Sequence, residues 1–239
     1  MSSDLFLCLD TATPTARVAV LDGAGGVRFS AEATAERHSS HVLPLCAEAL
    51  RAVSVAPAEL AGIACGGGPG SFTGLRVGLA VVKGLALASG VPIYVVSSLQ
   101  VLALDILSAR ASDAVTAVPC LDAGKGEIYV GAYVTDGAAL VRETAAECRL
   151  GAGALADWLA ALPAPCVVAG NGAERHQIAG RTAIAGPTAV SVGRLALLQR
   201  ARGAAANLAS AAPNYGRPPD ITVKKNPISS PRPAKRGEG

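Results

Sequence analysis

Residues 66–78 read Gly66-Gly67-Gly68-Pro69-Gly70-Ser71-Phe72-Thr73-Gly74-Leu75-Arg76-Val77-Gly78. A short apolar run precedes this stretch and a long, largely apolar segment follows it, which predicts a strand over 62–66, a glycine-rich loop and a helix over about 71–89. The start of such a helix collects backbone N–H donors and the positive end of the helix dipole, which suits an anion or a close backbone contact. The loop is not a Walker A motif, because no Lys followed by Ser or Thr stands at the required spacing. A tight strand-to-helix turn without a ligand is the simpler interpretation.

The segments around this loop predict one α/β half. Three strands joined by short turns, over 5–10, 17–22 and 27–34, form an antiparallel meander. A helix over about 39–53 follows, with Ser39 or Ser40 as its cap and apolar residues at helical spacing. A strand over 93–97 and a helix over about 99–109 come after the glycine loop and its helix.

A second, smaller round of the same kind begins at Val115. Strands over 115–121 and 128–135 form a hairpin around 122–126, and a helix near 155–162, a strand over 166–169 and a helix over 191–202 follow. We therefore predict an α/β protein of two related subdomains, 1–110 and 111–216. Residues 217–239 are rich in Pro, Lys and Arg without periodicity and predict a disordered tail.

The composition of the 239 residues excludes several classes of protein. Hydrophobic residues make up 51% and the mean hydropathy is +0.40, so wholesale disorder is excluded. Aromatic residues are only 3%, which argues against base stacking as a route to nucleic-acid binding. The formal net charge is +3, but the tail after Gly216 carries +4 and residues 1–216 carry −1. The body therefore lacks the basic character that drives tight binding of a phosphate backbone.

The sequence also bears on the compartment. The longest uncharged run is broken by Gly90-Val91-Pro92, so we expect no membrane span, and the start, Met1-Ser2-Ser3-Asp4, has no positive region typical of a signal peptide. The six cysteines are scattered without a Cys-x-x-Cys pair. Free thiols in a reducing cytoplasm are the expected state.

Five motifs resemble the TsaB (YeaZ) family, and together they cover roughly residues 4–220. They are Gly68-Pro69-Gly70-Ser71-Phe72-Thr73-Gly74-Leu75-Arg76, Leu9-Asp10-Thr11-Ala12-Thr13, His38-Ser39 with Leu43-Pro44, Leu121-Asp122-Ala123 with Gly126-Glu127-Ile128-Tyr129, and Pro213-Asn214-Tyr215. The resemblance implies the actin-like ATPase (ribonuclease-H-like) fold with two related α/β subdomains. It also implies a non-catalytic scaffold role in the bacterial complex that installs N6-threonylcarbamoyladenosine at position 37 of tRNAs that read ANN codons. The implied partners are the catalytic paralogue TsaD, the ATPase TsaE and, when the chain is alone, a second copy; tRNA would be met through the complex.

The sequence departs from the active members of this fold at two places. The catalytic relative carries a metal-binding His-x-x-x-His, where this chain has Ser98 and Leu102, so we expect no metal. Active ATPases place an Asp-x-Gly turn after the first strand, whereas here Asp10 is followed by Thr11, Ala12, Thr13 and Pro14, which removes an N–H donor. We interpret Asp10, Thr11 and Thr13 as a vestigial nucleotide site. No tightly bound cofactor is expected, and ATP or ADP would bind only weakly or at an interface of the complex.

Two other functions stay open at this point. One is a small-molecule kinase or ATPase of the same fold, with Asp10 as the acidic group; the other is a metallopeptidase-like protein. His38-x-x-His41 offers a weak metal pair, and a solvent-exposed pair at a helix start is the simpler interpretation. Lys125 is interpreted as a solvated hairpin tip rather than a phosphate ligand.

The helix after the glycine loop predicts a contact surface. Gly70, Gly74 and Gly78 are spaced by four residues, and glycines inside a helix cost stability, so the spacing needs a reason. A smooth stripe lets another backbone approach closely, and the resemblance favours an interface with a partner; a stripe facing the chain's own sheet is the alternative. The predicted interface residues are Val42, Cys46, Gly74, Arg76, Gly78 and Val81.

Overall fold

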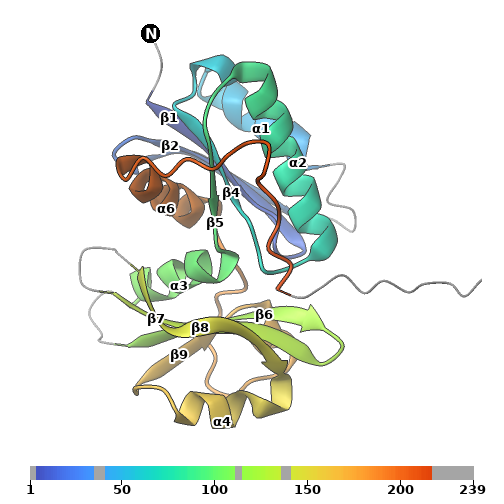
Figure 1. The fold of residues 1–239 in the computed structure, drawn as a ribbon, viewed down its shortest axis with the longest axis vertical. Helices are drawn as coiled ribbons and strands as arrows, with labels where there is room; N and C mark the ends of the chain where they lie inside the picture. The colour runs from blue at the N-terminus through green and yellow to red at the C-terminus, as the bar shows by residue number, and fades with distance from the viewer. Residues whose placement is uncertain (1–3, 35–40, 111–114, 136–140, 217–239) are drawn as a thin grey trace, which may run out of the picture.

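The computed structural model describes residues 4–34, 41–110, 115–135 and 141–216. Within them the chain forms two β-sheets, drawn one above the other in Figure 1. The predictions for the helix cap at Ser39 or Ser40, for His38 and for the tail over 217–239 lie outside the described residues.

The first sheet has the strand order β3-β2-β1-β4-β5. The elements of this half are β1 (Leu5–Asp10), β2 (Thr15–Asp22), β3 (Val27–Thr34), α1 (Val42–Ala52), a 3-10 turn (Pro57–Glu59), β4 (Gly62–Gly66), α2 (Phe72–Ser89) and β5 (Ile93–Val96). β1 pairs antiparallel with β2 and parallel with β4, and β4 pairs parallel with β5. β1 and β4 are continuous apolar runs because helices cover both of their faces.

The second sheet has the strand order β8-β7-β6-β9. The remaining elements are α3 (Ser98–Ser108), β6 (Thr116–Gly124), β7 (Glu127–Thr135), β8 (Val141–Gly151), a 3-10 turn (Ala152–Ala154), α4 (Leu155–Ala160), β9 (Cys166–Ala169), α5 (Asn171–Arg175) and α6 (Ala189–Ala201). β6, β7 and β8 form an antiparallel meander and β9 pairs parallel with β6, which repeats the arrangement of β1, β2, β3 and β4. The prediction of two related α/β halves is confirmed.

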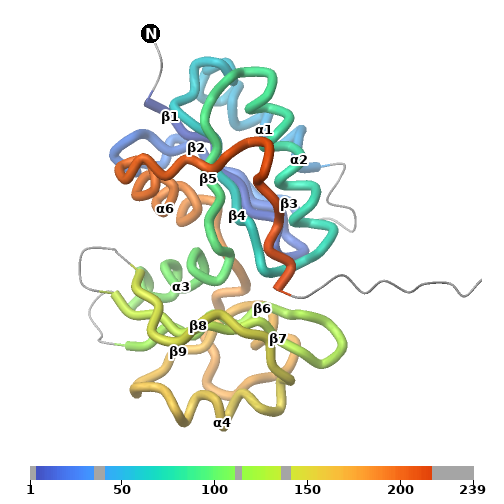
Figure 2. Tube along the Cα trace, viewed as in Figure 1, coloured from blue at the N-terminus to red at the C-terminus, as the bar shows by residue number. Residues whose placement is uncertain are grey.

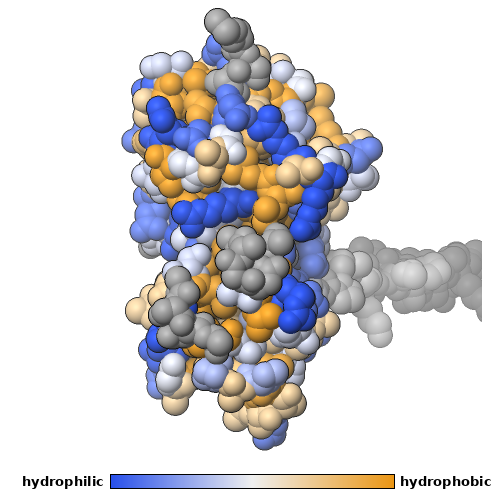
Figure 3. Space-filling model, turned by 90° about the vertical axis from the view of Figure 1, so that its left-hand side faces the viewer, coloured by the Kyte–Doolittle hydropathy of each residue, from blue (hydrophilic) through white to orange (hydrophobic). Residues whose placement is uncertain are grey.

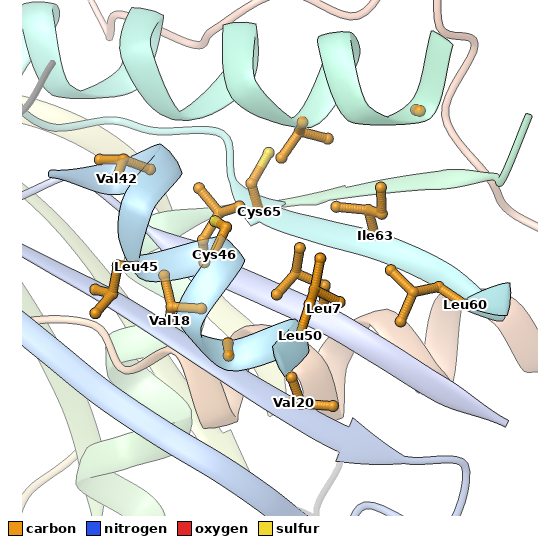
Figure 4. Close-up of a cluster of buried hydrophobic side chains, with 14 of the residues drawn as sticks. Leu7, Val18, Val20, Val42, Leu45, Cys46, Leu50, Leu60, Ile63 and Cys65 are labelled. Carbon is orange, nitrogen blue, oxygen red and sulfur yellow. The ribbon is translucent and has the colours of Figure 1, made fainter. Parts of the chain in front are cut away.

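The helix α1 packs on one face of the first sheet, mainly on β2 and β3. Figure 4 shows Val42 and Cys46 of α1 pointing toward Leu7, Val18 and Cys65 of the strands. All five side chains are at most 1% exposed. This burial explains the helical spacing of the apolar residues in α1, which faces the sheet rather than solvent.

Two helices pack across the boundary that the sequence predicts between 1–110 and 111–216. The helix α3 was expected to close the first half, but its Leu102 packs with Leu121 of the second sheet. The helix α6 was expected in the second half, but its Val192 packs with Phe6 of the first sheet. Figure 1 shows α3 against the lower sheet and α6 against the upper one. Chain order alone does not say which sheet a connecting helix covers, because both sheets offer an apolar face.

The helix α2 begins at a capped N-terminus. The hydroxyl of Ser71 accepts a hydrogen bond from the backbone N–H of Gly74 at 3.2 Å, and Gly90 ends the helix in the left-handed conformation with φ of 75°. α2 is the one described helix with the length and apolar composition of a membrane span. Here it lies on β4 and β5 with its buried face against the sheet, as a core helix does.

The surface between the two halves is mixed in character. Figure 3 shows the molecule narrowing between its upper and lower parts, with hydrophilic and hydrophobic residues interspersed on that face. The large exposed apolar side chains among the described residues are Val27, Leu43, Phe72 and Leu87. Two of them, Phe72 and Leu87, lie on α2, so this helix has an apolar outer side as well as a buried one.

Candidate functional site: the cleft between the two sheets

A cleft of about 820 Å³ lies where the two halves meet. The first half contributes residues 12–15 and 17 and the start of α2 at 70–72. The second half contributes residues 122–124 and 129 of the β6–β7 hairpin, residues 171, 174 and 175 of α5, and residue 185; the wall is completed by residue 215. A volume of this size between two lobes is typical of small-molecule sites.

Asp10 is the last residue of β1, two positions before the cleft-lining Ala12, and does not itself line the cleft. The residue is 0% exposed. Its Oδ1 accepts a hydrogen bond from the backbone N–H of Ala12 at 2.9 Å, and its Oδ2 has no hydrogen-bond partner. Burial raises the pKa of Asp10 to about 7, against the lowering effects of the Ala12 N–H, Arg17 and the nearby Ser98 hydroxyl.

The backbone of β4 and the start of α3 pack closely on the Asp10 carboxylate. A Cβ on Gly66 would overlap the carboxylate of Asp10, so the backbone of β4 lies directly against Oδ2. Ser98 is buried on the same side and accepts a hydrogen bond from the N–H of Gly68 at 3.1 Å. The carboxylate is therefore enclosed by strand backbone and by the first turn of α3.

The turn after β1 is closed by the chain itself. The carbonyl oxygen of Ala12 accepts a hydrogen bond from the N–H of Ser71 at 2.8 Å, and the Thr11 hydroxyl donates to the carbonyl oxygen of Gly74 at 2.8 Å. The Thr13 hydroxyl lies between the carbonyl oxygen of Thr15 and a guanidinium nitrogen of Arg17, at 3.3 Å from each. Thr11 and Thr13 are 1% and 3% exposed. The residues predicted as a vestigial nucleotide site thus follow one another in a single turn, and each bonds to other residues of the chain: Asp10 to Ala12, Thr11 to Gly74, and Thr13 to Thr15 and Arg17.

An actin-like ATPase fold implies a nucleotide with its metal in this cleft, and the residues present do not fit that group. The acidic side chain that would face the metal is enclosed, and two hydrogen bonds join the turn that would face the phosphates to the start of α2. Pro14 supplies no N–H donor. The degraded nucleotide site stays a prediction, and these contacts favour it, because the Ser71 N–H and the Thr11 hydroxyl are already paired within the chain.

The glycines of α2 have a different role from the one predicted. A Cβ on Gly74 would overlap the carbonyl oxygen of Thr11, and a Cβ on Gly78 would overlap the Thr11 hydroxyl. The prediction that this stripe is smooth for the approach of another molecule is therefore wrong, and the alternative, in which it faces the chain's own fold, is right. The two glycines let α2 lie directly on the turn after β1.

The other predicted interface residues divide in the same way. Val42 and Cys46 are 0% and 1% exposed and belong to the core, although Cys46 also lines the groove on the outside of α1 that is described below. Arg76 is exposed, with its guanidinium 5.4 Å from the centre of the Phe72 ring, and Val81 is half-buried on α2. Only Arg76 and Val81 of the six predicted residues thus remain available on the outer side.

The positions that carry a metal pair in the catalytic relative hold no ligands here. The Ser98 hydroxyl accepts the hydrogen bond from the Gly68 N–H, and Leu102 is 0% exposed in the core of the second half. Among the described residues, no group of three His, Cys, Asp or Glu side chains is placed to hold a metal ion. His41 is the N-cap residue just before α1, and its side chain makes no capping hydrogen bond. Lys125 is exposed at the tip of the β6–β7 hairpin, with φ of 55°.

The lower wall of the cleft contains a polar cluster that the sequence did not single out as a site. Asp122 accepts hydrogen bonds from the N–H of Gly124 at 3.1 Å and from Arg175 at 2.9 Å, and its own N–H donates to the Asn171 side chain at 3.2 Å. His176 Nε2 lies 3.7 Å from Oδ1 of Asp122, the oxygen that accepts from Gly124, whereas Arg175 binds Oδ2. The only sequence signal for this cluster was Asp122 at the predicted hairpin. α5, which supplies the rest, was not predicted because it has five residues.

A second depression lies on the outside of α1. This groove, of about 520 Å³, is lined by Leu43, Cys46, Ala47, Leu50, Arg51, Ser54, Val55, Pro57 and Leu85. Leu43 is 53% exposed at its edge, and Leu87 on α2 is 78% exposed. The outer side of α1 and α2 is thus apolar, with Arg51, Arg76 and Lys83 as its cations.

The sequence is similar to a known protein family and to characterised relatives. The family model described as TsaD, tRNA N6-adenosine threonylcarbamoyltransferase, matches residues 17–156, which is more than half of the chain. The tRNA threonylcarbamoyladenosine biosynthesis protein TsaB of Escherichia coli K12 is 33% identical over 130 residues, 54% of this chain and 55% of that protein. TsaB of Bacillus subtilis 168 is 33% identical over 127 residues, 53% and 54% of the two chains. The chain thus spans about half the length of the curated relatives it matches.

Solved structures agree with these matches over more of the chain. YeaZ from Pseudomonas aeruginosa superposes with a TM-score of 0.73 and 29% identity, over 88% of this chain and 100% of that chain. A crystal structure described as an uncharacterised protein with similarity to peptidase YeaZ from Pseudomonas aeruginosa gives a TM-score of 0.75 and 30% identity, over 91% and 100%. The fold is therefore the actin-like, ribonuclease-H-like α/β fold of the threonylcarbamoyltransferase type, as predicted. Within that class, the chain belongs to the TsaB/YeaZ family.

Proposed function

We propose that this chain is a non-catalytic scaffold subunit in the cytoplasmic synthesis of N6-threonylcarbamoyladenosine at position 37 of tRNAs that read ANN codons. The relatives named above support the pathway, since their names state a role in tRNA threonylcarbamoyladenosine biosynthesis. The proposed partners are the catalytic paralogue TsaD and the ATPase TsaE, with a second copy of the chain as partner when it is alone.

The enclosure of Asp10 is the observation that carries the non-catalytic part of the proposal. An acid that handles a metal or a proton has to reach the substrate, and this one is 0% exposed behind the backbone of Gly66. Ser98 and Leu102 stand where the catalytic relative has its metal pair, and both are engaged in packing. Neither a kinase nor a metallopeptidase, the two alternatives, is supported by these contacts.

The outer side of α1 and α2 is the proposed partner surface. It combines the apolar groove beside Leu43 with the exposed Leu87, and buried apolar side chains of this kind supply most of the binding energy at interfaces. Arg76 and Val81 keep their predicted place in this surface. Val42, Cys46, Gly74 and Gly78 act from inside, because they hold α1 and α2 on the sheet.

The experiment is co-purification of the chain with its catalytic relative, followed by assay of tRNA modification. The pure chain alone should form no threonylcarbamoyladenosine, and the mixture should. Leu87→Glu should weaken pairing at least tenfold, while Val27→Glu, which places the same charge on an exposed apolar residue of β3, should leave pairing unchanged. Modification by the pure chain would contradict the non-catalytic role, and equal pairing by both variants would move the interface elsewhere.

A further inference from the structure

The segment after α6 crosses from one half of the molecule to the other. We call residues 204–216 the strap. In Figure 2 this red segment runs over the upper sheet, turns down beside α2 and reaches the junction with the lower sheet, away from the connection between β5 and α3. Its course follows from hydrogen bonds made at every stage.

The strap is first attached to the upper half. The N–H of Ala206 donates to the carbonyl oxygen of Ile93 at 2.8 Å, which places the strap on the free edge of β5. The Lys83 ammonium of α2 donates to the carbonyl oxygens of Ala209 at 3.3 Å and Ala211 at 3.0 Å. The path of the strap over β5 and α2 is therefore fixed before it reaches the cleft.

At the cleft the strap lies on the glycine-rich loop. The N–H of Asn214 donates to the carbonyl oxygen of Gly67 at 2.7 Å, and a Cβ on Gly68, which has φ of 104°, would overlap the carbonyl oxygen of Asn214. The Tyr215 ring packs on Phe72 with 4.6 Å between centres. The Asn214 contacts hold the strap on the glycine-rich loop, and the Tyr215 contact holds it on the first residue of α2.

The last described residues then reach the lower half. The Tyr129 hydroxyl of β7 donates to the carbonyl oxygen of Tyr215 at 2.8 Å. Gly216 lies against the Tyr129 ring so closely that a Cβ would overlap it, and its N–H donates to the Asn214 side chain at 3.0 Å. Within four residues, 213–216, the strap thus contacts the glycine-rich loop of the upper half and strand β7 of the lower half.

We propose that the strap is a built-in clamp, which fixes the two halves of the cleft relative to each other in place of a bound nucleotide. The cleft lies between two lobes that a ligand would otherwise bridge, and its phosphate-facing turn is closed by Ala12 and Ser71. The Tyr215 carbonyl and ring supply the bridge at the cleft, in addition to the hydrogen bonds that join Asp105 of α3 to the start of α6. The orientation of the lower sheet is therefore set without ATP or ADP, and it does not change when they are added. This inference stands independently of the partner surface on α1 and α2.

The test removes the hydroxyl of one or the other of two tyrosines on β7, Tyr129 and Tyr133, and measures the exchange of backbone amides in the strap. Tyr129→Phe removes the hydroxyl that bonds to the strap, whereas Tyr133→Phe removes one that bonds to Glu147 within the lower half at 2.7 Å. Amide hydrogen exchange of the full chain should show the Asn214 N–H exchanging about two- to tenfold faster in Tyr129→Phe, as expected for the loss of one neutral hydrogen bond. The Ala206 N–H should be unchanged, and Tyr133→Phe should leave both amides at the native rate.

Two further measurements address the clamp itself. In Tyr215→Ala, which keeps the carbonyl but loses the ring on Phe72, residual dipolar couplings should show that the two sheets no longer share one alignment. Addition of magnesium with ADP or ATP to the native chain should leave the unfolding midpoint within one degree. The clamp is refuted by native Asn214 exchange in Tyr129→Phe, by an unchanged alignment of the sheets in Tyr215→Ala, or by a nucleotide-induced rise in the midpoint.

Discussion

Replacing Asp10 by Asn should stabilise the protein at neutral pH. Burial raises the pKa of Asp10 from 3.8 to about 7, so near and above neutral pH folding keeps a costly charge in the interior. One pKa unit corresponds to about 1.4 kcal/mol, so the shift lowers the free energy of unfolding by about 4 kcal/mol at high pH. Asn keeps the oxygen that accepts from Ala12 and removes the charge. We expect a gain of about 2–4 kcal/mol at pH 8.

The sign of the pH dependence follows from the direction of the shift. Between pH 4 and pH 7 the folded state keeps a proton on Asp10 that the unfolded chain has released, so the native stability falls as the pH rises through this range. Below pH 4 both states are protonated and the contribution of this group is fully favourable. The difference between Asp10→Asn and the native chain should therefore be close to zero at pH 4 and should reach its full value above pH 7.

Urea unfolding followed by circular dichroism, at unit steps from pH 4 to pH 8, measures this difference. Asp157→Asn is the control, because Asp157 is exposed on α4 and its replacement should change stability by no more than about 0.5 kcal/mol at any pH. A destabilised Asp10→Asn at pH 8, or a difference that does not grow with pH, would refute the view that Asp10 is an enclosed and unused charge. Such a result would return Asp10 to the status of a functional carboxylate.

Four other changes test the packing and the tail. Gly78→Leu should unfold the chain or cost at least about 3 kcal/mol in thermal melts, because its side chain would collide with Thr11, whereas Gly84→Ala, on the open side of the same helix, should stabilise it by about 0.5–1 kcal/mol. Asp105→Asn should cost about 1–3 kcal/mol by urea unfolding, because the carboxylate accepts three hydrogen bonds at the start of α6 and an amide has one acceptor oxygen. A chain ending at Pro219 should melt within a degree or two of the full chain, since few apolar groups are removed.

The strands predicted from the sequence are largely those of the structure, for reasons of burial. β1 and β4 are central and buried, so their apolar runs are continuous, and β3 ends where the sequence places it. β8 was missed because it is an edge strand held by β7 alone and carries Arg142, Glu143, Glu147 and Arg149 instead of an apolar run. Edge strands depend on their neighbour for pairing, and a single sequence does not display that neighbour.

The candidate site was predictable in composition but not in geometry. The sequence identified Asp10, Thr11 and Thr13 as one group; in the structure Thr13 lines the cleft, whereas Asp10 and Thr11 are buried beside it. It did not reveal that the Thr11 hydroxyl is paired with α2, because this bond joins Thr11 to Gly74, some 60 positions further along the chain. The cleft's lower wall was likewise missed, since it is assembled from a hairpin and a short helix.

The small residues of the glycine-rich signature bring the start of α2 against the turn after β1. Gly74 and Gly78 remove the side chains that would hold α2 away from the turn after β1. The approach lets the Ser71 N–H bind the carbonyl oxygen of Ala12 and the Thr11 hydroxyl bind the carbonyl oxygen of Gly74. The Ser71 N–H, a donor of the kind that binds phosphate at the start of a helix, is therefore paired within the chain. The close packing of α2 and the proposed lack of a nucleotide thus have one structural origin, and we expect that a phosphate could enter this turn only if α2 moved away from it, whatever residues follow Asp10.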